Sequence, residues 1–286
     1  MNLTRVVFFV SRRAGAREVA EKSAALLDKA GISLCAPREY SRSVPLPGCV
    51  ELVDDDACME GADLALVIGG DGSILRANYF AAPLGVPILG INMGRLGFLS
   101  ELEPDETELL SKLIDGQYSI ETRMMLSVSI RREDVCVYRA QALNDVCVNR
   151  AAGSKILSMD ILADEQFLAR FRADGVIIST PTGSTAYSLS AGGPIIEPTL
   201  ENMTITPICA HGLYAKSFVL APQRHIRLVL TDSHGAALSP DGRAGFSIEA
   251  GDEIQIAQSP YTTRLVRIKG KNVFEIIRDK LNYDYT

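Results

Sequence analysis

The sequence predicts an α/β domain built on a parallel sheet, followed by a domain that is mostly antiparallel β-structure. In the first part of the chain, apolar runs that suit buried strands alternate with segments whose apolar residues recur at helical spacing. After about residue 120, apolar residues recur instead with a period near two, which is typical of strands with one buried face. We therefore expect a first domain at residues 1–120, a β-rich domain at 121–271, and a final segment, 272–286, that returns to the first domain.

The first domain begins with a strand and a helix. Residues 5–10 form an apolar run, and apolar side chains then recur at helical spacing from Ala16 to Leu27. Strands that alternate with helices predict a doubly wound, Rossmann-like parallel sheet. The remaining expected elements are strands at 32–36, 64–68 and 87–91, a loop at 37–60, and a helix that opens at Pro104 and ends at Gly116.

The second domain has the pattern of short strands. Apolar residues two positions apart, such as Met159 and Ile161, recur along it. This pattern predicts an antiparallel β-sandwich. One helical stretch is expected around residues 183–191, and a last helix is expected at 273–281.

The composition suits a globular protein that binds small molecules. The chain has 286 residues, of which 22% are charged and 47% are apolar, and its net charge is −6. Lys and Arg are scattered, so we expect no nucleic-acid partner. The apolar runs fall short of the ~20 residues that span a bilayer, and the first residues carry no signal-peptide pattern. These features predict a cytoplasmic protein with no membrane partner.

Cysteine and histidine spacing gives no indication of a metal site. The six cysteines have no C-x-x-C spacing, and the three histidines are dispersed. Neither set has the ligand spacing of a zinc site. We expect reduced thiols and no transition metal held by the protein.

Residues 67–73 are the most informative stretch of the chain. An apolar strand runs into Gly69-Gly70-Asp71-Gly72, and a helix follows. Glycines let a bulky ligand approach the main chain, and the free N–H groups at a helix start attract anions. The Asp71 carboxylate would repel a phosphate, so it is better suited to accept a proton from a hydroxyl. The alternative is an ordinary strand-to-helix turn with Asp71 as its N-cap.

Residues 174–194 combine a strand with a loop that is rich in hydroxyl groups and glycine. Thr182, Ser184 and Thr185 could cap a helix or bind a ligand, and Tyr187 could stack on a base. The alternative is a well-capped helix start with a core tyrosine. This segment alone leaves both interpretations open.

The glycine-rich turn matches neither the P-loop nor the common dinucleotide-binding pattern. It resembles the turn of a superfamily that includes NAD kinases, lipid kinases and 6-phosphofructokinases. The chain lacks the Asn-Pro that lipid kinases usually carry near the first strand, and it lacks the Asp-x-Asp segment of phosphofructokinases. The segments in the order and spacing of NAD kinases are 66–76, 90–99, 142–146 and 174–194, together with 206–211 and 241–243.

The resemblance implies ATP-dependent phosphorylation of the 2′-hydroxyl on the adenosine ribose of NAD. The product would be NADP, and a divalent cation, usually Mg²⁺, would assist. Asp71 would be the proton acceptor, and metal ligands remain unassigned. The other residues that the resemblance implies in ligand binding are Gly72, Arg76, Asn144, Asp145, Arg172, Asp174, Thr185, Ala186, Tyr187, Ser188, Leu189, Ser190 and Arg243.

Two details of this set concern specificity. Relatives usually have Asn-Glu where this chain has Asn144-Asp145, so the shorter carboxylate would need a water or a small backbone shift to reach its partner. In related kinases, an arginine two positions before the aspartate, as in Arg172-Ala173-Asp174, accompanies a preference for NAD over NADH. By resemblance, the adenosine half would be held by Asn144, Asp145, Thr185, Ala186 and Tyr187, and the nicotinamide end by Asp174 and Ser190, with Arg172 nearby.

The resemblance also implies a homodimer or homotetramer. The apolar residues Ile205, Pro207 and Ile208 suggest that a neighbouring subunit completes the NAD site, although the same run also suits a buried strand. A non-catalytic NAD-binding sensor on the same fold is the alternative function. The intact turn around Asp71 argues against that alternative.

Overall fold

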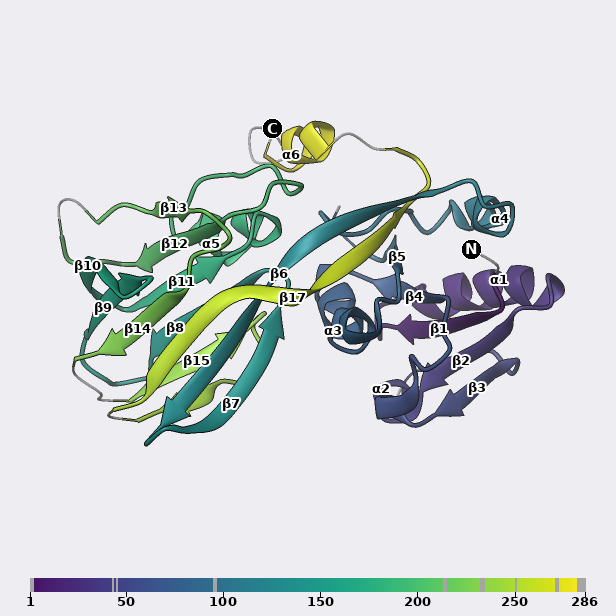
Figure 1. Cartoon of the computed structure of the whole chain (residues 1–286). Helices are drawn as coiled ribbons and strands as arrows, with labels where there is room; N and C mark the ends of the chain where they lie inside the picture. The colour runs from purple at the N-terminus through teal and green to yellow at the C-terminus, as the bar shows by residue number, and fades with distance from the viewer. Residues whose placement is uncertain are drawn as a thin grey trace. The chain divides into compact units, whose positions relative to one another are not determined.

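The computed structural model describes residues 3–42, 44, 46–94, 97–212, 215–231, 235–249, 251–270 and 273–281. The chain divides into two compact units, Met1–Thr122 with Thr262–Thr286, and Arg123–Tyr261 (Figure 1). It leaves the first unit within β6 (Ser119–Arg132) and re-enters it within β17 (Glu253–Arg267). Residues 262–270, which the sequence analysis placed in the β-rich domain, fall in the first unit because Leu265 of β17 pairs with Ile88.

The first unit is built on a parallel sheet in the order β3-β2-β1-β4-β5. Almost every residue of β1 and β4 is buried. Helices cover both faces of such a sheet, which is why these strands are continuous apolar runs in the sequence. The strand bounds are β1 Arg5–Val10, β2 Ser33–Pro37, β3 Val50–Val53, β4 Leu64–Gly69 and β5 Ile88–Asn92.

Helices α1 (Ala16–Lys29) and α3 (Asp71–Ala81) pack on this sheet (Figure 1). Phe8 belongs to the core cluster that includes the buried face of α1, whereas the ring centroid of Phe9 lies 6.1 Å from that of Phe80 in α3. Successive side chains of a strand point to opposite faces of the sheet. The two helices therefore cover opposite faces, as the doubly wound prediction requires.

Two local predictions for the first unit are wrong. The expected loop at 37–60 contains α2 (Arg38–Ser41), β3 and a short 3₁₀ turn, η1 (Asp55–Ala57). Only the first residue of β3 is buried, so an edge strand of this kind lacks the apolar pattern of the central strands. The helix expected from Pro104 begins later, as η3 (Thr107–Leu109) and α4 (Leu110–Ile114). The other short elements are η2 (Ala82–Leu84) and α6 (Val273–Leu281), the latter as predicted.

The second unit is antiparallel. One sheet has the order β13-β12-β11-β8-β15-β16, and β10, β9, β14 and the first part of β17 pair in a second sheet, in which β6 also pairs with β7. One hydrophobic cluster joins Val148 and Ile178 of the first sheet with Ile161 and Leu228 of the second. The bounds are β7 Val135–Ala142, β8 Asp145–Arg150, β9 Leu157–Ala163, β10 Gln166–Ala173, β11 Gly175–Ser179, β12 Met203–Ile208, β13 Phe218–Leu220, β14 Ile226–Leu230, β15 Ala236–Pro240 and β16 Phe246–Ile248.

These observations confirm the predicted fold class, an α/β unit followed by an antiparallel sandwich. The expected helical stretch is present as η4 (Thr182–Thr185) and α5 (Tyr187–Ser190). Among the described residues, the structure contains no helix with the length and apolar character needed to cross a membrane.

Candidate active site

The glycine-rich turn joins the end of β4 to the start of α3, as predicted. The N–H of Ser73 donates to the carbonyl of Gly70 at 2.8 Å. A Cβ atom at Gly69 would overlap the Ser73 hydroxyl, so glycine is required at this position. Gly70 is the N-cap residue and Asp71 is the first residue of the helix, which removes the interpretation of Asp71 as an ordinary N-cap.

The carboxylate of Asp71 is held by backbone donors from a distant segment. Its Oδ2 accepts the N–H of Phe98 at 2.9 Å, and its Oδ1 accepts the N–H of Leu99 at 3.2 Å. A Cβ at Gly97 would overlap Oδ1, so the loop approaches the carboxylate as closely as glycine allows. Because a carboxylate offers about four lone pairs, Asp71 keeps acceptor capacity for a ligand hydroxyl. A carboxylate held in this way can accept a proton from a ligand hydroxyl.

Two further residues predicted at this turn differ in their surroundings. A Cβ at Gly72 would meet nothing within 4 Å, so its main chain is open to a ligand. The guanidinium of Arg76 lies over the ring of Tyr40, 4.8 Å from its centroid. The exposed Arg76 side chain is therefore placed by a cation–π contact within the first unit.

In the second unit, Asp241 holds the turn that carries Asn144 and Asp145. Its carboxylate accepts the N–H groups of Leu143 at 2.9 Å, Asn144 at 2.7 Å and Asp145 at 3.2 Å. The N–H of Asp241 donates in return to the carbonyl of Asp145 at 2.9 Å. Asp241 has a positive φ of 49°, a conformation that aspartate adopts more readily than most residues. The family resemblance gave Asp241 no role of its own, and the Asp-Gly pair directly after a strand is the sequence signal that points to it.

The same turn is held from a second direction by the hydroxyl-rich segment. The N–H of Thr180 donates to the carbonyl of Asn144 at 2.9 Å, and its hydroxyl donates to the carbonyl of Leu143 at 2.6 Å. A Cβ at Gly183 would overlap the Asn144 backbone. The fold therefore brings the predicted binding segments around residues 144–145 and 182–190 together.

Within the 182–190 segment, some predicted residues are available to a ligand and others serve the fold. Tyr187 is 43% exposed, so its ring is free to stack on a planar group. Ser190 is also exposed. Ser188 is buried and its hydroxyl pairs with that of Thr206 at 3.0 Å, while the Thr185 hydroxyl donates to the Thr182 carbonyl at 3.2 Å. Leu189 and Ala186 are partly buried beside them.

Asp174 pairs with an arginine that was not among the predicted site residues. Its Oδ1 accepts from Nε of Arg150 at 2.6 Å, and Arg150 also donates from Nη1 to the Ser154 carbonyl at 3.0 Å. Arg172 is exposed, and its carbonyl accepts the N–H of His211 at 2.7 Å. Arg150 is 24 residues from Asp174 in sequence, so no local spacing points to this pair.

Arg243 is tied to the backbone near the Asp241 turn. Its Nη2 donates to the carbonyl of Gln141 at 2.6 Å and its Nε donates to that of Pro240 at 3.2 Å. These bonds hold the guanidinium beside the strand ends that carry Asn144 and Asp241.

Burial raises the pKa of Asp145 to about 7, and the charge of Asp241 adds to the shift. Asp145 is only 5% exposed. Burial also raises the pKa of Asp241, while the three backbone N–H groups and Arg243 act in the opposite direction. Since Asp241 accepts three hydrogen bonds, it is the carboxylate that stays ionised, and Asp145 is the one that holds its proton near neutral pH.

The Asp145→Asn variant should therefore be more stable than the parent at about pH 8, by up to about 4 kcal/mol, and should lose most of this advantage by about pH 4.5. A raised carboxyl pKa means that the folded parent binds a proton more tightly than the unfolded chain, so its stability falls as pH rises towards 7. Thermal unfolding of both proteins across this range measures the difference. A difference independent of pH would contradict the assignment.

Comparisons with known proteins agree with these two parts of the chain. Residues 6–118 match the N-terminal domain of ATP-NAD kinases, and residues 143–268 match their C-terminal domain. The NAD kinase of Carboxydothermus hydrogenoformans is 44% identical over 82% of this chain and 84% of its own length. The NAD kinase of Aromatoleum aromaticum is 36% identical over 94% of this chain and 91% of its own.

Two solved structures are also similar. Yeast NADH kinase complexed with NADH has a TM-score of 0.89 and 26% identity, and covers 100% of this chain and 89% of that one. An NAD kinase from Archaeoglobus fulgidus in complex with ATP has a TM-score of 0.70 and 27% identity, and covers 98% of both chains. The chain thus has both family domains in the expected order, a relative with more than 40% identity over most of its length, and the same fold as a solved member. The chain belongs to the ATP-NAD kinase family.

Proposed function

We propose that this chain transfers the terminal phosphoryl group of ATP to the 2′-hydroxyl on the adenosine ribose of NAD, giving NADP and ADP. Family membership supports the NAD kinase reaction. The observation that carries the mechanism is the Asp71 carboxylate, which the amides of Phe98 and Leu99 hold at the start of α3.

In this mechanism, Asp71 takes the proton of the ribose 2′-hydroxyl. The bond between O2′ and the γ-phosphorus forms as the bond from that phosphorus to the β,γ-bridging oxygen breaks, and ADP leaves. The transition state of such transfers is loose, so positioning and charge neutralisation contribute most, and the base contributes about 10²–10⁴ in rate. The open main chain at Gly72, in the first turn of α3, would bind phosphate oxygens.

The second unit would supply the contacts to NAD. Asn144 and Asp145 would bond the adenosine, on a turn that Asp241 fixes, and the exposed ring of Tyr187 would stack on the adenine. Thr185 and Ala186 would enclose the adenine with it. Asp174 and Ser190 would hold the nicotinamide end.

A divalent cation, usually Mg²⁺, would enter with ATP and neutralise charge on the triphosphate. Mg²⁺ keeps much of its water and often takes only one or two carboxylates from the protein. The described part of the chain contains no group of three His, Cys, Asp or Glu side chains that could form a cage for an ion. We therefore assign no protein ligand to the cation and derive no step through it.

An assay of NADP formation from NAD and Mg-ATP tests the proposed function. Purified protein should form NADP at a rate proportional to its concentration, detected with an NADP-specific dehydrogenase. NAD binding without NADP formation would instead favour a non-catalytic sensor.

The chain should prefer NAD to NADH, and Arg172→Gly should narrow the gap in kcat/KM. The expectation rests on the arrangement Arg172-Ala173-Asp174, in which the exposed Arg172 follows the pattern of NAD-preferring relatives. Charge alone predicts a wider gap after Arg172→Gly, because loss of a positive charge favours the cationic nicotinamide ring of NAD over the neutral ring of NADH. The control is Arg170→Gly. Arg170 lies on the same strand and pairs with Asp160. A wider gap after Arg172→Gly would contradict the prediction.

We also propose a homodimer or homotetramer, on family resemblance alone. The apolar run that suggested a subunit contact is accounted for within one chain: Ile205 is fully buried in the core of the second unit, and Ile208 packs against Cys147 and Ile177. Light scattering of the active protein should report an oligomer. A fully active monomer would defeat the proposal.

A further inference from the structure

We propose that Arg267 is a positioning residue for the base Asp71 and acts through the backbone of Leu99. The inference rests on the proposed role of Asp71 as proton acceptor. Arg267 lies at the end of β17, 196 positions after Asp71 in sequence, and the two side chains share no hydrogen bond in the described contacts. Their link is a single residue that bonds to both.

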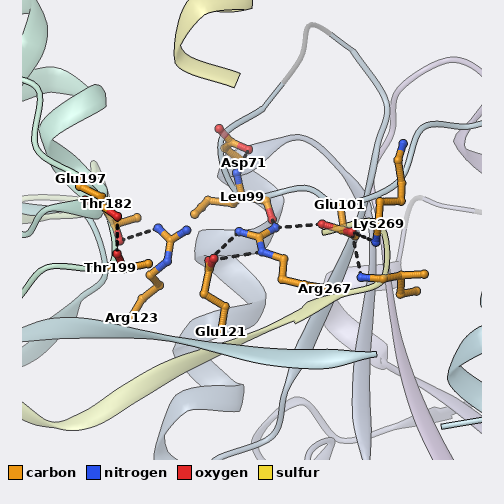
Figure 2. Close-up of polar contacts among 11 residues, drawn as sticks. Asp71, Leu99, Glu101, Glu121, Arg123, Thr182, Glu197, Thr199, Arg267 and Lys269 are labelled. Atoms are coloured by element: carbon orange, nitrogen blue, oxygen red, sulfur yellow. Dashed lines mark hydrogen bonds and ion pairs between the residues drawn. The ribbon is translucent and has the colours of Figure 1, made fainter. Parts of the chain in front are cut away.

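Leu99 is that link. Its N–H donates to Oδ1 of Asp71 at 3.2 Å, and its carbonyl accepts from Nη1 of Arg267 at 3.4 Å. Figure 2 shows the three residues in this order, with the Arg267 guanidinium on the side of Leu99 away from Asp71. The N–H and the carbonyl belong to the two peptide planes that meet at the Leu99 Cα, so the position of the carbonyl constrains the N–H through the φ and ψ of this one residue.

Two carboxylates hold the Arg267 guanidinium in turn. Glu121 Oε1 accepts from Nη2 at 2.9 Å and from Nε at 3.3 Å, and Glu101 Oε2 lies 3.3 Å from Nη1 (Figure 2). The side chain of Arg267 is 12% exposed and that of Glu101 is 2% exposed. A planar guanidinium that never loses its charge can donate in several fixed directions at once, which a lysine cannot do.

Glu101 also ties the loop to the chain that follows Arg267. Its Oε1 accepts the N–H groups of Ile268 at 2.9 Å and Lys269 at 2.6 Å. Its own N–H donates to the carbonyl of Gly90 in β5 at 2.9 Å. The segment that carries Leu99 is thus fixed both to the central sheet and to the end of β17.

The network joins the base to both strands that connect the units. Glu121 lies on β6 and Arg267 on β17, and the chain passes between the units within these strands. Arg267 reaches Asp71 only through the backbone of Leu99, so its loss should lower the rate of the chemical step more than the affinity for NAD. A misplacement of about 1 Å can cost up to about 10²-fold in rate.

The test combines Arg267→Met with Asp71→Asn in a double-mutant cycle. Alone, Arg267→Met should lower kcat by about 10-fold or more while KM for NAD stays within about 3-fold. In the Asp71→Asn background, the same substitution should change kcat by less than about 2-fold, because the group that it positions is already absent. Arg264→Met is the matched control: Arg264 is exposed on the same strand and donates to the carbonyl of Gly85 at 2.9 Å.

The cycle separates this inference from the proposed function. An Asp71→Asn variant with a kcat within a factor of a few of the parent's would refute the proposed role of Asp71 as base. Two outcomes would refute the positioning role alone, provided that Asp71→Asn itself strongly lowers kcat. In the first, Arg267→Met has the parent's kcat; in the second, the losses of the two single variants multiply in the double variant. If Arg267→Met does not fold, Glu121→Gln takes its place: it keeps the side-chain shape, loosens the guanidinium, and should lower kcat by about 3-fold only where Asp71 is present.

Discussion

The Asp71→Asn variant should bind NAD with little change while its kcat falls by about 10²–10⁴. Asparagine has nearly the same size as aspartate but cannot take the ribose proton. The proposed NAD contacts, Asn144, Tyr187 and Asp174, all lie in the second unit and are untouched by the substitution. Steady-state kinetics of NADP formation, together with NAD binding by calorimetry, measures the two effects separately.

A second effect of this substitution needs its own control. Both Asp71 oxygens accept backbone N–H groups, from Phe98 and Leu99, and an asparagine amide offers only one acceptor oxygen. Gly97→Ala disturbs the same contact, because its Cβ would overlap Oδ1, but it keeps the carboxylate group in the protein. If Asp71 is the base, kcat should fall further in Asp71→Asn than in Gly97→Ala. Turnover of Asp71→Asn within a factor of a few of the parent would mean that Asp71 only shapes the loop.

The Asp241→Ala variant should raise KM for NAD by about 10-fold or more and lower the free energy of unfolding by about 2–4 kcal/mol. The substitution leaves three backbone N–H groups without their acceptor. Leu143 and Asp145 are buried, so water does not readily replace the carboxylate. Each buried donor that loses its partner costs about 1–3 kcal/mol. The turn that presents Asn144 and Asp145 should then lose its single conformation.

Asp134→Ala is the control for this effect. Asp134 is also an aspartate at positive φ, 64°, in the turn between β6 and β7, but its side chain is fully exposed. It should change neither KM nor the unfolding midpoint appreciably. An Asp241→Ala variant with the parent's KM would show that the turn is held by Thr180 and Gly183 alone.

Local residue chemistry was enough to predict the turn at Asp71. A buried apolar strand, the closely approached Gly69 and a following helix lie within about ten residues of one another, and the structure has the turn in that place. The change of apolar period after about residue 120 likewise predicted the antiparallel unit, because each strand's burial pattern depends on its own alternation. Where that pattern was weak, at the edge strand β3, the prediction failed.

Partners that lie far apart in sequence were decided only by the tertiary structure. Asp71 obtains its donors 27 and 28 residues later, and Asp241 holds a turn 96 to 98 residues earlier. Asp174 pairs with Arg150 rather than with Arg172 two positions before it. In the link from Arg267 through Leu99 to Asp71, the hydrogen bond between Arg267 and Leu99 joins residues 168 positions apart. The sequence by itself determined the family, the two kinds of sheet and the candidate base, since these depend on local pattern and motif. Which groups hold that base, and which carboxylate stays protonated, depended on packing, because hydrogen-bond partners and desolvation exist only once distant segments meet.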